Sequence, residues 1–388
     1  MTYKLAQNTI SNEDIDSLVE WLKTYPPLTM PAGSLTKKFE EEWSKKIGVK
    51  YSVFCNSGSS ANLLAYSALS YKYSDLQNVF LSASGWATTL SPILQLDNLF
   101  PFVLEVDKDT FGIDIVNLKY VLEHNLDTNI LVVLVHTLGI PNNMDAILEL
   151  QKKYNFLLME DCCPAVGSKY KNRYVGTFGN VSTFSLYYGH QLSTIEGGMV
   201  CTNDEELYNL LLMLRSHGWS KDLSKEAREI LEKKWDILEH HSSFTFYVSG
   251  YNLRPTEINS FLGLKQVNKL DEVVSARNER FWYYHRKLKN YFIVPNPPED
   301  STVSCITFPC ICFDQSIDSI VSKLKKNNIE TRPISGGSLG KQPMFQNCIR
   351  QRVNYPFADL LDSNGFVLPC HPEISFEDID FICNLLIN

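Results

Sequence analysis

The sequence predicts an α/β fold in which helices cover a mostly parallel β-sheet. Through the first two thirds of the 388 residues, apolar runs of strand length alternate with segments whose apolar residues recur at helical spacing. The strand-length runs are rich in Val, Ile and Leu without polar alternation, which is typical of parallel strands buried on both faces. Because such strands alternate with helices, the pattern favours a parallel sheet with helical crossovers.

The predicted elements follow one another in a regular order. Strands are predicted at residues 51–55, 79–84, 102–106, 130–136 and 156–160. Helices are predicted between them at 61–71, 115–124 and 144–154, where the apolar spacing is nearer to 3.6 than to 2. Two further strands, 181–185 and 199–202, are separated by a short segment, and this arrangement suits a hairpin-like pair.

The remaining third mixes helices and strand. Helices are predicted at 205–217, 225–238, 271–291, 317–327 and 376–386, and a strand at 302–313. A chain of 388 residues is too long for one simple core, so we expect two domains. We place a large domain at 1–245, with the N-terminal segment included, and a smaller one at 246–388.

The bulk composition is that of an ordinary globular protein, with 44% hydrophobic and 21% charged residues. The longest apolar run, 130–135, is far too short to span a membrane, and the N-terminus lacks a secretion signal. We therefore expect a cytoplasmic protein. The net charge of −8 argues against broad nucleic-acid binding, but local donors can still bind an anionic small molecule.

The ten cysteines do not predict a disulfide framework. Cys162 and Cys163 are adjacent, Cys55 and Cys201 lie in apolar runs, and no Cys-x-x-Cys pair occurs. Buried free thiols in a reducing compartment are the expected state.

Three short motifs each follow a predicted strand. Asn-Ser-Gly-Ser-Ser-Ala at 56–61 opens a helix, where backbone N–H groups can bind phosphate, although such turns also simply redirect a chain. Trp86 follows the next strand and could stack on an aromatic cofactor or fill a core position. Asp161 ends a buried strand, where its carboxylate could pair with a pyridinium nitrogen or cap the following turn.

Taken together, these motifs and the segment around His190 resemble the DegT/DnrJ/EryC1/StrS sugar aminotransferases of the fold-type I pyridoxal-phosphate enzymes. The resemblance continues through His217-Gly218, Gly250 to Glu257, Thr331-Arg332-Pro333 and Leu368 to Pro372, and so covers nearly the whole chain. It implies a large domain with a seven-stranded sheet and a smaller α+β C-terminal domain.

The same resemblance implies specific roles for the cofactor-binding residues. Gly58, Ser59 and Ser185 would bind the phosphate, Trp86 would stack on the pyridine ring, and Asp161 would bind its nitrogen. Asn252 would reach the phosphate of the neighbouring subunit's cofactor, which implies a homodimer with shared sites. Where the family often has a polar side chain near the ring oxygen, this chain has Pro164, which cannot donate a hydrogen bond.

The main departure from the family pattern is His190, which stands where the family has its Schiff-base lysine. Imidazole cannot form a stable imine, but it can move protons near neutral pH. Because no lysine occurs between Lys171 and Lys221, a small shift of register does not restore one. Within the family, this exchange marks the sugar 3-dehydratases. A branch of these carries an iron–sulfur cluster, but Cys310 and Cys312 are followed by no cysteine until Cys348, so we expect no cluster.

The resemblance therefore implies a lyase that uses pyridoxal or pyridoxamine phosphate to remove the C3 hydroxyl of a nucleotide-linked 4-keto-6-deoxy sugar, by resemblance GDP-linked, in 3,6-dideoxysugar synthesis. His190 would be the acid and base, and glutamate would rebuild the amine form of the cofactor. A sugar 4-aminotransferase and a catalytically silent ligand-binding relative remain the alternatives.

Three further residues have open roles in this scheme. His217 could orient His190 or the sugar, or could cap a helix. Arg254 and Arg332 could bind the substrate diphosphate or the donor carboxylate, or could form structural ion pairs.

Overall fold

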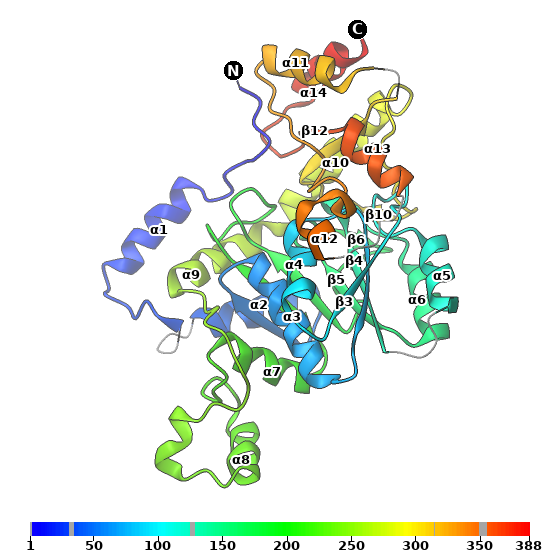
Figure 1. Ribbon diagram of the computed structural model, residues 1–388. Helices are drawn as coiled ribbons and strands as arrows, with labels where there is room; N and C mark the ends of the chain where they lie inside the picture. Colours follow the sequence, from blue (N-terminus) through cyan, green and yellow to red (C-terminus); the bar gives the residue numbers. More distant parts are fainter. Residues whose placement is uncertain (1, 31–34, 125–128, 314, 349–354) are drawn as a thin grey trace.

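The computed structural model describes residues 2–30, 35–124, 129–313, 315–348 and 355–388. At its centre is a seven-stranded sheet with the order β1-β9-β8-β5-β4-β2-β3 (Figure 1). Its strands are β1 (Tyr51–Cys55), β2 (Asn78–Ser82), β3 (Phe100–Leu104), β4 (Ile130–Val135), β5 (Leu157–Asp161), β8 (Val181–Ser185) and β9 (Gly198–Thr202). Only β9 is antiparallel to its neighbours, β1 and β8. The predicted mostly parallel sheet and the hairpin-like pair are confirmed.

Helices cover both faces of this sheet. One face packs against α3 (Gly58–Lys72), α4 (Ala87–Gln95) and α7 (Glu205–Arg215). The other packs against α2 (Leu35–Ile47), α5 (Ile115–His124) and α6 (Met144–Tyr154). Successive strand residues point to opposite faces, so on β2 Val79 and Leu81 join the first core while Phe80 joins the second. This two-sided burial explains the continuous apolar strands.

The C-terminal part forms a further core above the sheet in Figure 1, close to both chain ends. The strands β11 (Thr307–Ile311) and β12 (Gly365–Pro369) pair antiparallel. They pack with α10 (Leu270–Leu288), α11 (Ile317–Lys326) and α14 (Phe376–Ile387). Cys310 and Cys312 are buried in this core. The domain boundary near residue 245 stays a prediction.

Smaller elements complete the described chain. The helices are α1 (Asn12–Leu22), α8 (Lys225–Lys234), α9 (Glu257–Gln266), α12 (Pro343–Cys348) and α13 (Pro356–Asn364). The short strands β6 (Lys169–Tyr170), β7 (Arg173–Tyr174) and β10 (Ser301–Thr302) form a small antiparallel sheet. Short 3-10 turns lie at Thr137–Gly139, Glu239–Phe244, Val267–Lys269 and Leu339–Lys341.

The continuous strand predicted at 302–313 is wrong, because the chain leaves one sheet and enters another within it. Thr302 pairs with β6, whereas β11 pairs with β12. Side chains bind the backbone between them: Arg277 Nη1 donates to the carbonyls of Cys305 (2.8 Å) and Ile306 (3.2 Å). The alternating sequence is that of a strand, but these side-chain bonds from distant elements replace a partner strand.

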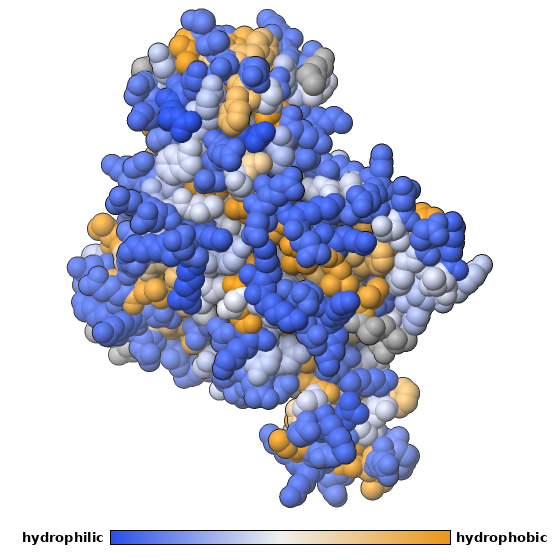
Figure 2. Space-filling model, turned by 180° about the vertical axis from the view of Figure 1, so that it is seen from behind, coloured by the Kyte–Doolittle hydropathy of each residue, from blue (hydrophilic) through white to orange (hydrophobic). Residues whose placement is uncertain are grey.

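A lobe that contains α8 stands away from the body at the bottom of Figures 1 and 2. Hydrophobic atoms show on its surface in Figure 2. Five of its large apolar side chains are between 57% and 73% exposed: Ile230, Trp235, Leu238, Phe244 and Phe246. Among the described residues, no helix combines the length and apolar character needed to cross a membrane.

Candidate active site

A cavity of about 460 Å³ lies at the carboxyl ends of the parallel strands. This edge of an open α/β sheet is where ligands generally bind, because loops from several strands meet there. Seven residues predicted from sequence line the cavity: Gly58, Ser59, Trp86, Asp161, Ser185, His190 and Arg332. The predicted residues His217, Asn252 and Arg254 do not line it.

The N-terminus of α3 forms one end of the cavity. Ser57 caps this helix by accepting from the N–H of Ser60 (3.1 Å), and the first-turn N–H groups of Gly58 and Ser59 have no acceptor within the helix. A Cβ on Gly58 would lie 2.5 Å from the Cβ of Ser185, so only glycine allows this serine to approach the helix end. The Ser59 hydroxyl also donates to Thr88 Oγ1 (3.0 Å). N–H groups and hydroxyls thus converge where a helix dipole favours an anion, which fits a cofactor phosphate.

We expect Gly58→Ala to weaken cofactor binding strongly, because the added methyl group would displace Ser185 from the helix end. The loss of affinity for pyridoxal phosphate should be about tenfold or more, the cost of roughly one charge-assisted hydrogen bond. Titration of the cofactor-free protein, followed by absorbance, measures it. Gly48→Ala, where a Cβ meets nothing within 4 Å, is a control for strain at a glycine with positive φ.

Asp161 lies at the end of β5 and is only 2% exposed. Its Oδ2 accepts from Thr89 Oγ1 (2.7 Å) and Asn62 Nδ2 (3.0 Å), and its Oδ1 accepts from the N–H of Cys163 (3.1 Å). A carboxylate has about four acceptor positions, so one is left for a donor in the cavity. A pyridinium N–H is such a donor, and the arrangement fits this partner.

Trp86 precedes α4 and is 55% exposed. This exposure rules out the alternative of a core tryptophan between sheet and helix. An indole at the edge of the cavity offers a flat surface for an aromatic ring.

His190 is half-buried at the cavity wall, and its ring orientation is set by one short hydrogen bond. Its Nδ1 lies 2.6 Å from the carbonyl oxygen of Cys163. Because a carbonyl only accepts, the proton must be on Nδ1, which leaves the Nε2 lone pair free. Burial lowers the pKa of His190 to about 4, with smaller contributions in the same direction from Arg332 and Arg277. The neutral imidazole at pH 7 is therefore a base with one available nitrogen.

The lowered pKa of His190 should make the cofactor-free protein less stable in mild acid. Between the folded pKa of about 4 and the ordinary value of 6.5, the unfolded chain binds more protons, so stability rises with pH across this window. His190→Asn removes this contribution. The drop in melting temperature between pH 7.5 and pH 5 should be smaller in the variant than in the parent, and an equal drop would contradict the assigned environment.

Gln191 was not predicted from the sequence, but it fixes the His190 segment to its surroundings. Its Nε2 donates to the carbonyls of Pro164 (2.8 Å) and Ser304 (2.6 Å), and the side chain is fully buried. Pro164 thus lines the cavity and accepts a hydrogen bond through its backbone. This link ties the residue after His190 to both the β5 end and the crossover that precedes β11.

Two charged side chains of the cavity lack partners among the described residues. The guanidinium of Arg332 makes no hydrogen bond or ion pair there, and burial lowers its pKa. Glu196, which was not predicted from the sequence, also lines the cavity, and its carboxylate has no hydrogen-bond or ion-pair partner there. No lysine is among the described residues that line the cavity.

His217, Asn252 and Arg254 form a separate group around Trp219. The His217 ring centroid lies 5.0 Å from that of Trp219, and the Arg254 guanidinium lies 5.6 Å from the same ring. Arg254 Nε donates to Asn252 Oδ1 (3.1 Å). His217 has a φ of 60° after α7, where the Gly218 N–H donates to the Met213 carbonyl (2.8 Å), so its backbone closes the helix. The catalytic role of His217 stays a prediction.

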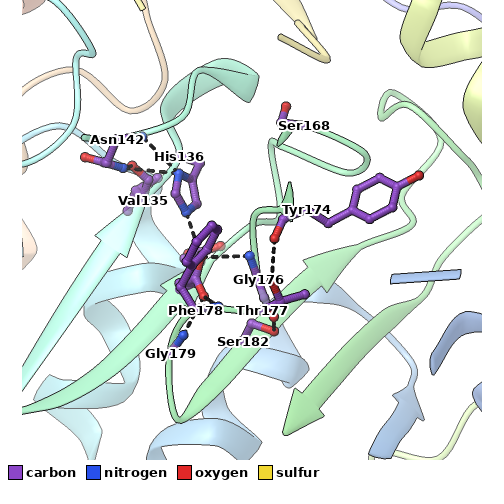
Figure 3. Close-up of polar contacts among 12 residues, drawn as sticks. Val135, His136, Asn142, Ser168, Tyr174, Gly176, Thr177, Phe178, Gly179 and Ser182 are labelled. Carbon is purple, nitrogen blue, oxygen red and sulfur yellow. Dashed lines mark hydrogen bonds and ion pairs between the residues drawn. The ribbon is translucent and has the colours of Figure 1, made fainter. Parts of the chain in front are cut away.

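A buried cluster beside the cavity has the residue types of a metal site but works as a hydrogen-bonded unit. The cluster is His136, Glu160 and Cys162. Glu160 accepts from the N–H groups of Gly176, Phe178 and Gly179, each at 2.7 Å, and lies 3.2 Å from His136 Nε2 (Figure 3). These contacts fill its acceptor positions. Of the two acids that end β5, Glu160 therefore holds the loop before β8, whereas Asp161 faces the cavity.

Comparison with known proteins places this cavity in context. The model of the DegT/DnrJ/EryC1/StrS aminotransferase family matches residues 8–387. The chain is 33% identical to GDP-4-keto-6-deoxy-D-mannose 3-dehydratase of Escherichia coli O55:H7, over 91% of this chain and 92% of the relative. It is 28% identical to GDP-perosamine synthase of Escherichia coli O157:H7, over 96% of this chain and 92% of the relative.

This chain is also similar to a solved structure over almost the whole length of both chains. That structure is GDP-4-keto-6-deoxymannose-3-dehydratase with a trapped PLP-glutamate geminal diamine. The TM-score is 0.89 at 30% identity, and 99% of this chain and 100% of that chain are covered. The fold is therefore that of the fold-type I enzymes, as predicted.

Proposed function

This chain belongs to the DegT/DnrJ/EryC1/StrS aminotransferase family, and we propose that it is a dehydratase within that family. Its substrate would be a nucleotide-linked 4-keto-6-deoxy sugar, GDP-linked as in the 33% identical relative, from which it removes the C3 hydroxyl. The observation that carries the proposal is His190. It occupies the lysine position of the family, its Nε2 is free, and no lysine lines the described cavity.

Residues that contact the cavity would hold the cofactor without a covalent bond. Gly58, Ser59 and Ser185 would bind its phosphate, Trp86 would cover its ring, and Asp161 would accept from the ring nitrogen. When bound, pyridoxamine phosphate supplies the amine that joins the sugar's C4 carbonyl and a ring that takes up electrons.

The proton steps would belong to His190. Its Nε2 would take a proton from the cofactor's C4′ carbon and return it to the C3 hydroxyl oxygen of the sugar as that group leaves. The bond from Nδ1 to the Cys163 carbonyl keeps the imidazole in one orientation throughout. A lysine there would form the imine with the cofactor, which directs family members towards amination.

Glutamate would restore the amine form of the cofactor. The relative with a trapped PLP-glutamate adduct supports this donor. In this chain the unpaired guanidinium of Arg332 can bind one of its carboxylates. Arg254 lies outside the cavity, so it would bind the diphosphate only across a dimer interface.

One assay distinguishes the candidate functions. The protein is incubated with pyridoxal phosphate, glutamate and GDP-4-keto-6-deoxymannose, and the products are identified by mass spectrometry. Ammonia and a 4-keto-3,6-dideoxy sugar support dehydration. A stable 4-amino sugar would instead make the chain an aminotransferase like GDP-perosamine synthase, and no turnover of either substrate would mark a silent relative.

The exposed lobe predicts a homodimer with shared sites. Asn252 and Arg254 lie outside the cavity of their own chain, near a lobe whose apolar side chains are uncovered. A second copy that covers these side chains would bring Asn252 towards a neighbouring cofactor. Such an exposed apolar group is typical of an interaction surface.

We expect the double variant Trp235→Lys/Phe244→Lys to shift the protein from dimer to monomer, because both side chains are more than half exposed in the lobe. Sedimentation velocity measures the change. Val116→Lys, on α5 and 77% exposed, is the matched control and should leave the dimer intact. A parent protein that sediments as a monomer would contradict the shared site.

A further inference from the structure

The turn between His190 and β9 contains a strained residue. Ile195 has a φ of 73°, and it is the only β-branched residue with positive φ among the described non-glycine residues. A branched Cβ makes this region unfavourable, so the surrounding structure must enforce it. Backbone strain of this kind is concentrated at functional sites.

Hydrogen bonds from both sides hold this turn. The Ile195 N–H donates to Ser193 Oγ (3.0 Å), and the Tyr188 N–H donates to the Ile195 carbonyl (3.1 Å). Asn259 Nδ2 donates to the carbonyls of Thr194 (2.8 Å) and Glu196 (3.1 Å), the residues on either side of Ile195. One amide therefore binds both flanks of the strained residue.

The Asn259 amide is itself fixed by α9. Its Oδ1 accepts from the N–H (3.1 Å) and the hydroxyl (2.6 Å) of Thr256, which caps the helix. Because the oxygen accepts from these two donors, the nitrogen must face the turn. The start of α9 and the turn are thus linked through a single side chain with all its bonds in use.

The turn presents the Glu196 carboxylate to the cavity. Glu196 lines the same cavity as His190, and its backbone carbonyl is bound, but its carboxylate makes no hydrogen bond or ion pair among the described residues. Asp161, in contrast, already accepts three hydrogen bonds. The next residue, Gly197, must be glycine, since a Cβ there would lie 2.2 Å from Thr194 Oγ1. The turn therefore places at the cavity a carboxylate, that of Glu196, which accepts no hydrogen bond from the described residues.

We propose that Glu196 accepts hydrogen bonds from hydroxyl groups of the substrate's sugar, and that Asn259 is the positioning residue that holds it there. This assignment rests on the proposed function. Glutamate carries two carboxylates and one ammonium, so its net negative charge is repelled by Glu196, as is a diphosphate. A sugar ring brings neutral hydroxyl donors, which a carboxylate binds well.

The test compares two ligands that differ only by the sugar. The affinities of the cofactor-loaded protein for GDP and for GDP-mannose, which has no keto group and does not react, are measured by calorimetry. The parent should bind GDP-mannose more tightly than GDP. Glu196→Gln and Glu196→Ala should weaken GDP-mannose binding about tenfold, as expected for loss of a hydrogen bond to a charged group, and leave GDP within about twofold. Glu299→Gln, an exposed glutamate outside the cavity, is the matched control.

Asn259→Asp tests the positioning role, because it turns the donor to the turn into an acceptor that repels both carbonyls. The carboxylate still accepts from Thr256, so the cap of α9 is kept, but the donor to Thr194 and Glu196 is lost. The variant should show the same selective loss for GDP-mannose. Combining it with Glu196→Gln should add little, because both changes remove one interaction.

The outcomes are distinct. Unchanged affinities in the Glu196 variants, or equal losses for GDP and GDP-mannose, overturn the sugar contact. Additive losses in the double variant overturn the positioning role. The glutamate-driven conversion of bound cofactor, followed by absorbance without any sugar, separately tests the cofactor chemistry on which the proposed function rests. It should be no slower in the Glu196 variants than in the parent, because they remove a charge that repels glutamate. A parent that binds both ligands equally overturns the sugar contact even if that conversion succeeds.

Discussion

His190→Asn should abolish dehydration while leaving the cofactor bound. The amide can replace the Nδ1–H donor to the Cys163 carbonyl, but it offers no basic nitrogen to the cavity. General acid–base catalysis contributes about 10² to 10⁴ in rate, and His190 is assigned both proton transfers, so a loss of at least about 10³ in kcat is expected. Release of ammonia from glutamate and GDP-4-keto-6-deoxymannose measures the rate.

The control for this prediction is the binding step. The variant keeps the residues assigned to the cofactor: Gly58, Ser185, Trp86 and Asp161. Because these non-covalent contacts are unchanged, its affinity for pyridoxal phosphate should stay within about threefold of the parent's. The companion variant His190→Lys should form a covalent imine, visible as a shifted absorbance and trapped by borohydride. Full dehydration by His190→Asn would remove His190 as the base.

The sequence predicted the cavity residues best where each directly follows a strand. Ser59 and Trp86 follow β1 and β2, Asp161 is the last residue of β5, and parallel strands bring such ends to one edge of the sheet. The family resemblance then predicted the cofactor-binding role of each residue, which its place in the sheet does not indicate by itself. Residues of this kind are predictable because a local motif and the sheet topology together determine their place.

The residues that the sequence analysis missed act through contacts between distant segments. Gln191 binds the carbonyl of Ser304, and Asn259 binds those of Thr194 and Glu196. Neither amide has a local motif that points to these carbonyls, since Ser304, Thr194 and Glu196 each lie at least 63 residues from the amide that binds them. The same reason explains the strand wrongly predicted at 302–313, where Arg277 on α10 satisfies the backbone. The sequence near such a carbonyl does not indicate which distant side chain donates to it.

Asp161→Asn should reduce turnover about as strongly as the loss of His190, although the change is only one atom. The amide cannot carry the negative charge that stabilises a protonated ring nitrogen, so electrons from the reacting carbon lose their acceptor. Its NH₂ group would also meet a donor, because Oδ2 faces Thr89 and Asn62 while Oδ1 faces the Cys163 N–H. Removal of one such electrostatic contact costs about 10² to 10³ in kcat, and the added donor clash brings the expected loss to the upper end.

The effect of Asp161→Asn on catalysis can be separated from a folding defect by comparing its loss of kcat with its loss of melting temperature. Glu160, the neighbouring acid, is held by three N–H groups in a different environment. Glu160→Gln should therefore lower the melting temperature more than it lowers kcat per folded molecule, since a buried amide replaces an acceptor of several hydrogen bonds. Asp161→Asn should do the reverse and lower kcat per folded molecule by a larger factor, relative to its loss of melting temperature, than Glu160→Gln does. If both variants lost stability and activity in the same proportion, Asp161 would have a structural role only, and the electron acceptor would need another partner.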